Sequence, residues 1–239
     1  MNEPRLELVR PSIIALGIAL GGALVGHGFV RARAADRFVT VKGIAERKVQ
    51  ADIAFWPITL SAADNDLRQA QTRIDGQIEQ IKAFLTKQGL DPSGFEVQTP
   101  GVSDAFTNQF RDPSKLITRY VVQQTLMITS EKPQAVAAAS RQVGELVSAG
   151  MVLTGQGPIY AFTRLNDIKP EMIAEATKRA REAAEQFAHD SGGRLDGIRQ
   201  ANQGVFEIQP RDPVPGATEE SQMNKTVRVV TTVQYALAG

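Results

Sequence analysis

The chain has 239 residues, of which 42% are hydrophobic and 22% are charged, and this composition is ordinary for a folded globular protein. Its formal net charge is +1, so there is no basic excess of the kind that binds nucleic acid through phosphates. With no cysteine and two histidines, the sequence excludes disulfides, thiolate chemistry and histidine-rich metal sites. We therefore expect no nucleic-acid partner, no metal and no cofactor.

An uncharged segment runs from Ser12 to Val30, with arginines on both sides. A membrane-spanning helix needs about 20 apolar residues, whereas the apolar core of a signal peptide has roughly 7 to 15. The length favours a retained transmembrane helix that contacts the lipid bilayer through residues 12–30. The run Ala32-Arg33-Ala34 resembles a signal-peptidase site, so cleavage stays the alternative. Residues 1–37 are interpreted as an N-terminal membrane anchor or signal segment.

Four glycines in this segment form two overlapping G-x-x-x-G spacings: Gly17, Gly21, Gly22 and Gly26. Such spacings place small residues on one helical face and let two helix backbones approach closely. They predict packing between the anchors of several copies. Glycine is also frequent in membrane helices without that role, and this alternative stays open.

Two segments typical of β-strands open the folded body, at residues 37–43 and 52–62, because they carry β-branched and aromatic side chains. Pro57 has no backbone N–H, so we expect the second segment to be an edge or bulged strand. A helix begins within residues 64–66 and ends at Gly89. Its apolar side chains recur at steps of three and four: Leu67, Ala70, Ile74, Ile78, Ile81 and Leu85.

Further strands and helices are expected in the rest of the chain. Strands are expected near residues 95–108, 116–130, 152–164, 195–208 and 225–237. A helix is expected from Ser130 to Ala149, and another is entered through Pro170 and ends near Gly193. The apolar face predicted for this last helix comprises Ile173, Ala176, Ala180, Ala183 and Phe187.

Two identical tripeptides, Arg111-Asp112-Pro113 and Arg211-Asp212-Pro213, fall at the same point of two similar successions of elements. We interpret residues 38–239 as an α+β domain made of two β-α-β-β-like halves by internal duplication. The lobes are expected at roughly 38–130 and 150–239, with a connecting helix at 131–149. Helices over one face of each sheet would bury its apolar side chains.

The sequence resembles the SIMPL-domain family of exported bacterial proteins. The resemblance rests on "VTVKGIAERKVQADIAFWPITLSA", on "GPIYAFTRLNDIKPEMIAEATKRAREAAEQFAHDSGGRLDGIRQANQGVF" and on the closing "VRVVTTVQYAL". It implies an α+β subunit on the periplasmic side, assembly into ring-like or channel-like oligomers, and a link to oxidative-stress defence. It implies no catalytic residues. An uncleaved anchor would place this chain in the inner membrane as a single-pass protein, whereas cleavage would leave it soluble in the periplasm.

Two loops are candidate contact regions for a subunit or another partner. Residues 99–115 carry aromatic side chains beside a turn, and residues 209–224 form a long loop stiffened by prolines. The candidate contact residues are Phe106, Phe110, Arg111, Asp112, Arg211 and Asp212. For the two phenylalanines, packing in the core is the alternative, and the long loop is interpreted as either functional or mobile.

No residue pattern predicts catalysis, so we do not expect an enzyme. The leading hypothesis is a membrane-anchored periplasmic subunit whose partner is itself and whose sheet edges build a homo-oligomer that supports envelope integrity or stress defence. The alternative is a periplasmic binding module for a peptide, an envelope protein or a small ligand.

Overall fold

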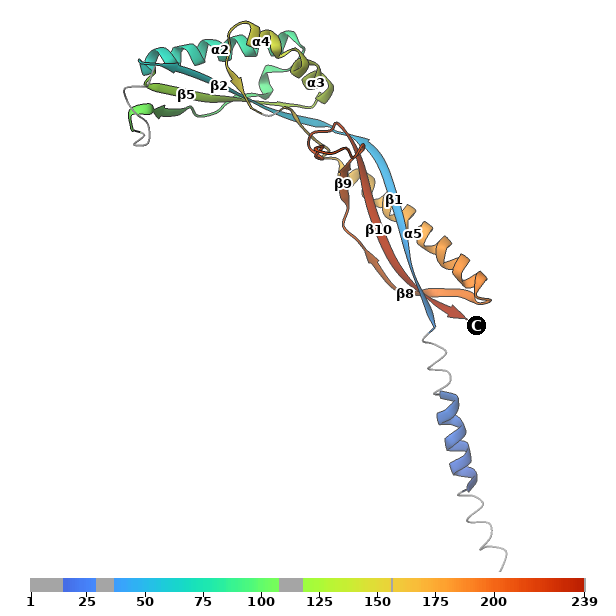
Figure 1. Ribbon diagram of the computed structural model, residues 1–239. Helices are drawn as coiled ribbons and strands as arrows, with labels where there is room; N and C mark the ends of the chain where they lie inside the picture. The colour runs from blue at the N-terminus through green and yellow to red at the C-terminus, as the bar shows by residue number, and fades with distance from the viewer. Residues whose placement is uncertain (1–14, 29–36, 108–117, 156, 239) are drawn as a thin grey trace, which may run out of the picture. The chain divides into compact units, whose positions relative to one another are not determined.

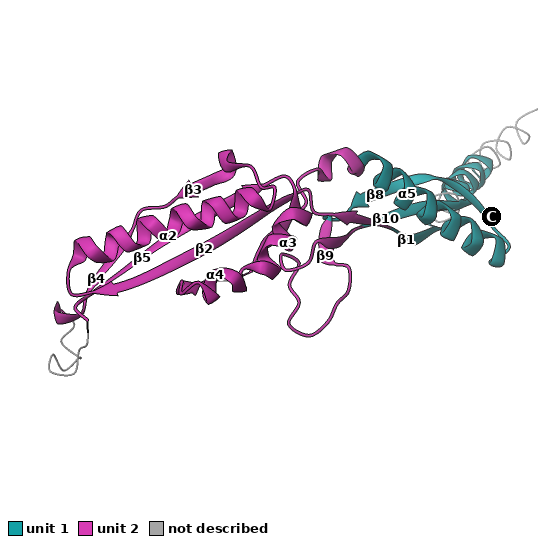
Figure 2. Cartoon of the chain, turned by 90° about the horizontal axis from the view of Figure 1, so that it is seen from above, with its two compact units in different colours: residues 1–45, 170–206, 229–239 teal, residues 46–169, 207–228 magenta. Residues whose placement is uncertain are grey.

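The computed structural model describes residues 15–28, 37–107, 118–155 and 157–238 (Figure 1). It confirms an α+β fold with two antiparallel sheets. The chain forms two compact units (Figure 2): unit 1 comprises residues 1–45, 170–206 and 229–239, and unit 2 comprises residues 46–169 and 207–228. Strands β1 (Phe38–Gln50) and β10 (Asn224–Ala238) and helix α5 (Leu165–Asp190) contribute residues to both units.

Residues 15–28 form a helix. Its larger apolar side chains are exposed, among them Leu24 and Val25, which are 72% and 74% accessible. None of the helices in the described part of the chain is long and apolar enough to cross a membrane. The predicted span continues on both sides into residues 12–14 and 29–30, which lie outside the described residues, as does the run Ala32-Arg33-Ala34.

The sheet of unit 2 is built on two long strands, β2 (Ile53–Asp64) and β5 (Tyr120–Ser130), paired over eleven residues. Its strand order is β3-β5-β2-β6, where β3 is Phe95–Val97 and β6 is Leu153–Thr154. Strand β4 (Gly101–Asp104) also pairs with β5, and β7 (Ile159–Ala161) also pairs with β2. Short 3₁₀ turns precede β3 at Pro92–Gly94 and follow β4 at Ala105–Thr107.

Helix α2 (Leu67–Lys87) covers one face of this sheet, together with α3 (Pro133–Gln142) and α4 (Gly144–Ser148) (Figure 1). The side chain of Asp66 caps α2 by accepting a hydrogen bond from the backbone N–H of Arg68 at 2.8 Å. The predicted apolar stripe is confirmed, except that Leu67 is exposed. The buried members are Ala70, Ile74, Ile78, Ile81 and Leu85, which pack against inward residues of β2 and β5.

The expectation that Pro57 marks an edge strand is wrong, because β2 lies inside the sheet. On the side opposite β5, β7 pairs with residues 53–55 and β6 pairs with residues 59–60. Pro57 falls between these two short strands, where no described ladder needs its missing N–H. A Cβ added to Gly155 would lie 3.1 Å from the carbonyl oxygen of Pro57, so the connection between β6 and β7 passes close to this point.

The sheet of unit 1 has the order β1-β10-β8, with β8 at Arg194–Gln203. Strand β9 (Glu207–Pro210) pairs with β10 within unit 2. Helix α5 covers the unit 1 sheet. Its predicted apolar face is correct at Ala176 and Ala180 and wrong at Phe187, which is 61% exposed, while Ile173 and Ala183 are half-buried. The buried row follows steps of four and consists of one methionine and four alanines: Met172, Ala176, Ala180, Ala184 and Ala188.

Pairing between distant strands also changes the predicted division into lobes. The order of elements along the chain follows the expected succession, yet β1 pairs with β10, while β6 and β7 pair with β2. The compact units therefore do not coincide with residues 38–130 and 150–239, since antiparallel pairing joins segments that are far apart in sequence. The segment expected as one connecting helix, residues 131–149, forms α3 and α4 and belongs to unit 2. Internal duplication stays a hypothesis.

Replacement of Gly43 tests the closeness of α5 to β1. A Cβ at Gly43 would lie 1.8 Å from the carbonyl oxygen of Ala176, so Gly43→Ala forces the helix backbone to shift. We expect it to lower the free energy of unfolding by about 1–3 kcal/mol or more, measured by urea denaturation. Gly197→Ala in β8 is the matched control, because a Cβ there meets nothing within 4 Å. Equal stability of the two variants would contradict the close contact.

Candidate functional site

Strand β8 is an open edge of the sheet in unit 1. It pairs with β10 along one side, and no described strand pairs with its other side. Nine of its ten residues are exposed, and Leu195 is half-buried. Edge strands expose backbone N–H and C=O groups that pair readily with a strand of another chain. This makes β8 the main candidate surface for assembly.

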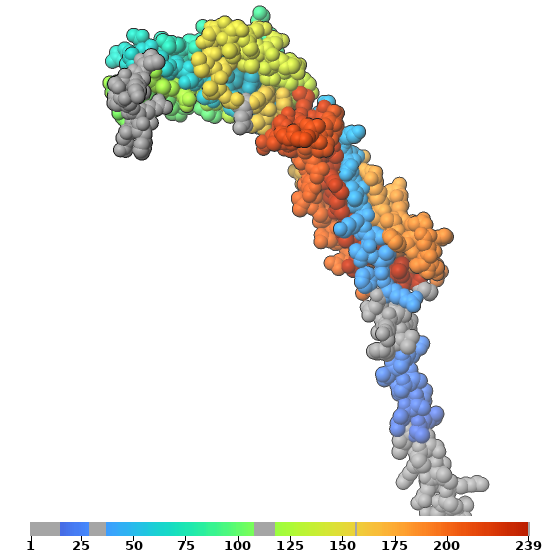
Figure 3. All heavy atoms as spheres, in the orientation of Figure 1, coloured from blue at the N-terminus to red at the C-terminus, as the bar shows by residue number. Residues whose placement is uncertain are grey.

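The packing of α5 explains why β8 stays uncovered. The helix buries its alanine row against Val41, Val233 and Tyr235, which belong to β1 and β10. Figure 3 shows the atoms of α5 beside those of β1 in this unit. A helix about 10 Å in diameter covers roughly two strands that lie about 4.8 Å apart. The third strand is therefore left to solvent on both faces, except at Leu195, which packs against this cluster.

The opposite edge of this sheet is already partly occupied. Arg179 of α5 donates a hydrogen bond from Nη1 to the carbonyl oxygen of Ile44 in β1 at 2.9 Å. The same guanidinium forms an ion pair with Glu175, with Nη2 and Oε1 2.5 Å apart. Since Ile44 no longer offers a free acceptor, β1 is the weaker candidate edge.

The regular part of β8 is its second half. Register shifts in its pairing with β10 lie on both sides of Tyr235, opposite the first half of β8. From Gln200 to Gln203 the pairing is continuous. Gly204 donates its N–H to Val230 of β10 at 2.8 Å, and strand N–H groups alternate in direction. The N–H of Ala201 consequently points away from β10, toward the open side.

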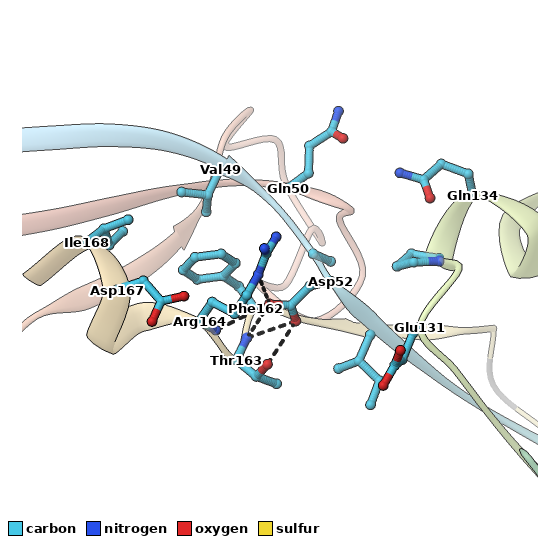
Figure 4. A pocket seen from close by; sticks show the side chains of 13 residues that line it. Val49, Gln50, Asp52, Glu131, Gln134, Phe162, Thr163, Arg164, Asp167 and Ile168 are labelled. Carbon is cyan, nitrogen blue, oxygen red and sulfur yellow. Dashed lines mark hydrogen bonds and ion pairs between the residues drawn. The ribbon is translucent and has the colours of Figure 1, made fainter.

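A groove of about 810 Å³ lies in unit 2 where the start of β2 meets the first turns of α3 and α5 (Figure 4). Its walls carry the acidic side chains of Asp52, Glu131 and Asp167, together with Phe162 and Gln134. Figure 4 shows Asp52 in the middle of the groove, hydrogen-bonded to Thr163 and Arg164.

Asp52 holds the first turn of α5. Its carboxylate accepts hydrogen bonds from the backbone N–H groups of Thr163 at 2.9 Å and Arg164 at 3.2 Å, and from Nε of Arg164 at 3.2 Å. These backbone groups have no partner inside a helix that starts here. Burial acts to raise the pKa of Asp52, but the hydrogen bonds from Thr163 and Arg164 outweigh it and hold the pKa below its ordinary value.

The main charged group of this groove, the carboxylate of Asp52, is held in place by its hydrogen bonds and its ion pair. The hydroxyl of Thr163 donates to Asp52 at 3.1 Å, and the charge of Arg164 is paired with the same carboxylate. In the described part of the chain, no group of three or more histidine, aspartate and glutamate side chains is arranged to hold a metal ion. The groove therefore stabilises the start of α5, and its acidic rim is accessible to a basic or polar ligand.

The predicted contact residues Arg211 and Asp212 lie in the loop between β9 and β10. They form an ion pair with each other at 2.8 Å, and both side chains are exposed. The loop is fastened further along, where Lys225, whose side chain is fully buried, forms an ion pair with Glu219. The backbone N–H of Tyr160 in β7 also donates to Glu220 at 2.8 Å. The loop thus packs on its own unit.

Phe106 lies in the 3₁₀ turn that follows β4 and is 54% exposed. The guanidinium of Arg119 stacks on its ring at 5.2 Å and on the ring of Tyr120 at 4.7 Å, while it forms an ion pair with Asp104 at 2.9 Å. The hydrogen bonds from Arg119 and from the backbone of Phe106 lower the pKa of Asp104. The structure brings Phe106 to the surface, whereas the other predicted residues of this loop, Phe110, Arg111 and Asp112, lie outside the described residues.

The four predicted glycines lie in the helix of residues 15–28. A Cβ added at any of them would meet no atom within 4 Å in this single chain: Gly17, Gly21, Gly22 and Gly26. Their role in packing between copies stays a prediction.

Asp52, Lys225 and Arg119 were not singled out from the sequence. Their partners follow no local spacing, because Thr163 lies 111 residues after Asp52 and Asp104 lies in a separate strand, 15 residues before Arg119. The alternation of apolar residues near Lys225 did carry a signal, because a lysine at an inward position of a strand must find a partner.

Substitution of Asp52 tests its role at α5. Because its pKa is lowered from 3.8, the carboxylate contributes stability above that pH and loses the contribution as the pH falls through the folded-state pKa. We expect Asp52→Asn to lower the free energy of unfolding by about 1–3 kcal/mol at pH 7, with a smaller difference at pH 3. Urea denaturation at both pH values measures this.

Asp75→Asn serves as the control for Asp52→Asn, because Asp75 lies on the exposed face of α2. We expect its effect to stay within about 0.5 kcal/mol. A loss of stability in Asp52→Asn that is the same at pH 7 and pH 3 would show that the charge of Asp52 is not responsible.

A comparison with known protein families gives one match. The family described as "SIMPL: Protein of unknown function (DUF541)" matches residues 39–235, which include both compact units. No curated protein matches the chain. The family match agrees with the resemblance seen in the strand and helix segments of the sequence. The chain therefore belongs to the SIMPL family.

Proposed function

We propose that this chain is a non-enzymatic, membrane-anchored periplasmic subunit that assembles with its own copies into a ring-like or channel-like homo-oligomer. The open edge of β8 is the observation that carries the proposal. A ten-residue strand paired on one side, with exposed side chains on both faces, offers a ready template for strand addition.

The packing of unit 1 supports this use of β8. Helix α5 lies in close backbone contact with β1 at Gly43, and its alanine row packs on β1 and β10. This packing leaves the edge of β8 uncovered, and strand addition would satisfy the backbone groups there. In this proposal, strand pairing at β8 uses backbone hydrogen bonds and needs no cofactor or metal ion.

The N-terminal segment supports attachment to the bacterial inner membrane. The helix of residues 15–28 exposes its large apolar side chains and carries no aspartate, glutamate, lysine or arginine. In the proposal, residues 12–30 cross the bilayer, with the G-x-x-x-G glycines between neighbouring copies and the folded units in the periplasm. Removal of the segment would instead give a soluble periplasmic subunit.

The physiological role proposed is support of envelope integrity or stress defence through the assembled particle. Thiol chemistry has no part in it, because the chain has no cysteine.

A second candidate function is a binding module for a peptide or envelope protein. The same β8 edge favours it, because an extended peptide adds to an open edge as a strand does. The two functions differ in particle mass: a binding module is a monomer until the partner is added, whereas a subunit assembles alone.

Proline at position 201 tests assembly through β8. Ala201→Pro removes an N–H that points to the open side and leaves the ladder to β10 intact. We expect its assembly to weaken by about tenfold or more, measured by native mass spectrometry of the full chain in a mild non-ionic detergent. Ala201→Val, which keeps the N–H, is the control. Unchanged particles in Ala201→Pro, or monomers in the unsubstituted chain, would contradict the proposal.

Retention of the anchor is tested on protein isolated from native membranes. We expect the polypeptide to keep residues 1–37 and to stay with the membrane after alkaline carbonate extraction, because an apolar helix is not released by removal of peripheral contacts. N-terminal sequencing and fractionation measure both. A mature chain that begins near Ala35 would contradict the retained anchor. Assembly through β8 would still be tested by Ala201→Pro.

A further inference from the structure

The sheet of unit 2 has one covered face and one bare face. Even-numbered residues of β2 and β5, such as Trp56 and Leu126, are buried under the helices. The odd-numbered residues point to the other side and are mostly half-buried. Figure 1 shows α2, α3 and α4 together on one side of these strands. We call the other side the bare face of unit 2.

The bare face has no charge in its centre. In a chain with 22% charged residues, none of the odd-numbered positions from Ile53 to Ala63 in β2, or from Val121 to Thr129 in β5, is charged. Among the described paired strands, the register places one charged residue on this face, Glu96 of β3 opposite Met127, at the rim. A partner of either charge would therefore find no complementary group in the middle.

One threonine pair lies at the centre of the face, and the two ends of the face differ in polarity. Thr59 and Thr125 stand at the midpoint of the eleven-residue ladder, and their hydroxyls lie 2.8 Å apart. Toward the start of β2 the face is apolar, with Phe55, Pro57 and Met127. Burial of these side chains against another apolar surface is favourable, and one of the two hydroxyls donates a hydrogen bond to the other within the face.

The area is sufficient for a dimer. The full-length strands β2 and β5, with the shorter outer strands β3, β4, β6 and β7, give a footprint of about 550 Å² at about 3.4 Å per residue and about 4.8 Å per strand. Two such faces bury about 1,100 Å² together, above the roughly 1,000 Å² that a specific interface needs. Two stacked sheets lie about 10 Å apart, so the half-buried side chains of both faces fill the space between them.

We propose that the bare face of unit 2 packs against the same face of a second copy of this chain, with a two-fold axis along the strands. This orientation places the apolar end of one face on the apolar end of the other and leaves Glu96 at the rim. An uncharged face meets its own copy without burial of an unpaired charge, which is the condition for a stable isologous contact. The contact is separate from strand addition at β8.

The absence of cysteine makes a direct test possible, because one introduced thiol reports only contact between copies. Thr59→Cys places the thiol at the centre of the bare face, and Thr72→Cys places it on the exposed side of α2. The full chain in a mild non-ionic detergent is treated with a short bismaleimide and analysed by denaturing electrophoresis. We expect about tenfold more cross-linked dimer for Thr59→Cys than for Thr72→Cys, since a sheet separation of about 10 Å is within reach.

A charge at the centre provides the second measurement. Thr125→Lys would bury an unpaired ammonium, so we expect association measured by sedimentation to weaken by about a hundredfold or more, with the same circular dichroism spectrum. Thr72→Lys is the matched control. If Thr125→Lys does not fold, the Thr59→Cys cross-link alone decides.

Both measurements are repeated with Ala201→Pro present, to separate this contact from pairing at β8. A Thr59→Cys cross-link that persists in that background supports the face contact even if assembly through β8 fails. Equal cross-linking of Thr59→Cys and Thr72→Cys, or unchanged sedimentation of a folded Thr125→Lys variant, overturns the proposal. Repeating the cross-linking in high salt distinguishes this interface from an ionic one, because an uncharged contact does not weaken as the salt concentration rises. A cross-link lost in high salt would also overturn it.

Discussion

The close backbone contact between α5 and β1 determines which surfaces of unit 1 are covered. With no side chain at Gly43 and alanines along the facing row, the helix approaches until Ala176 occupies the space of a Cβ. A helix held this closely covers two of the three neighbouring strands β1, β10 and β8. The uncovered third strand follows from a contact between two backbones, and the candidate assembly edge depends on it.

Unit 2 uses a different solution, with larger side chains. Isoleucines and leucines of α2 pack on Trp56 and its neighbours, and α3 and α4 extend the same layer. All helices of this sheet therefore lie on one side, and the other side is left uncharged and half-buried. The contact proposed at this face and the contact proposed at β8 use different strands, so one contact does not exclude the other.

Local patterns predicted much of this fold. The three-and-four spacing from Ala70 to Leu85 identified the helix face, since each turn buries the same side. The α5 face was predicted correctly at Ala176 and Ala180 only, because alanine differs little in hydrophobicity from its neighbours and Phe187, which was assigned to the apolar face, is exposed. The pairing of β1 with β10 and the anchoring of Asp52 by Thr163 depend on contacts between distant segments, which no local pattern records. For the same reason, the matching Arg-Asp-Pro tripeptides did not predict that strands from one predicted lobe pair with strands from the other, as β1 does with β10.

The buried lysine at the start of β10 has a consequence for proteolysis. Trypsin cleaves after lysine and arginine only where the chain is accessible and can be drawn into an extended path. The side chain of Lys225 is fully enclosed and bound to Glu219, whereas Arg211, in the loop that precedes β10, is exposed. Cleavage after Arg211 therefore reports the folded loop, and cleavage after Lys225 reports opening of the unit itself, so the ratio of the two fragments follows local unfolding with no added label.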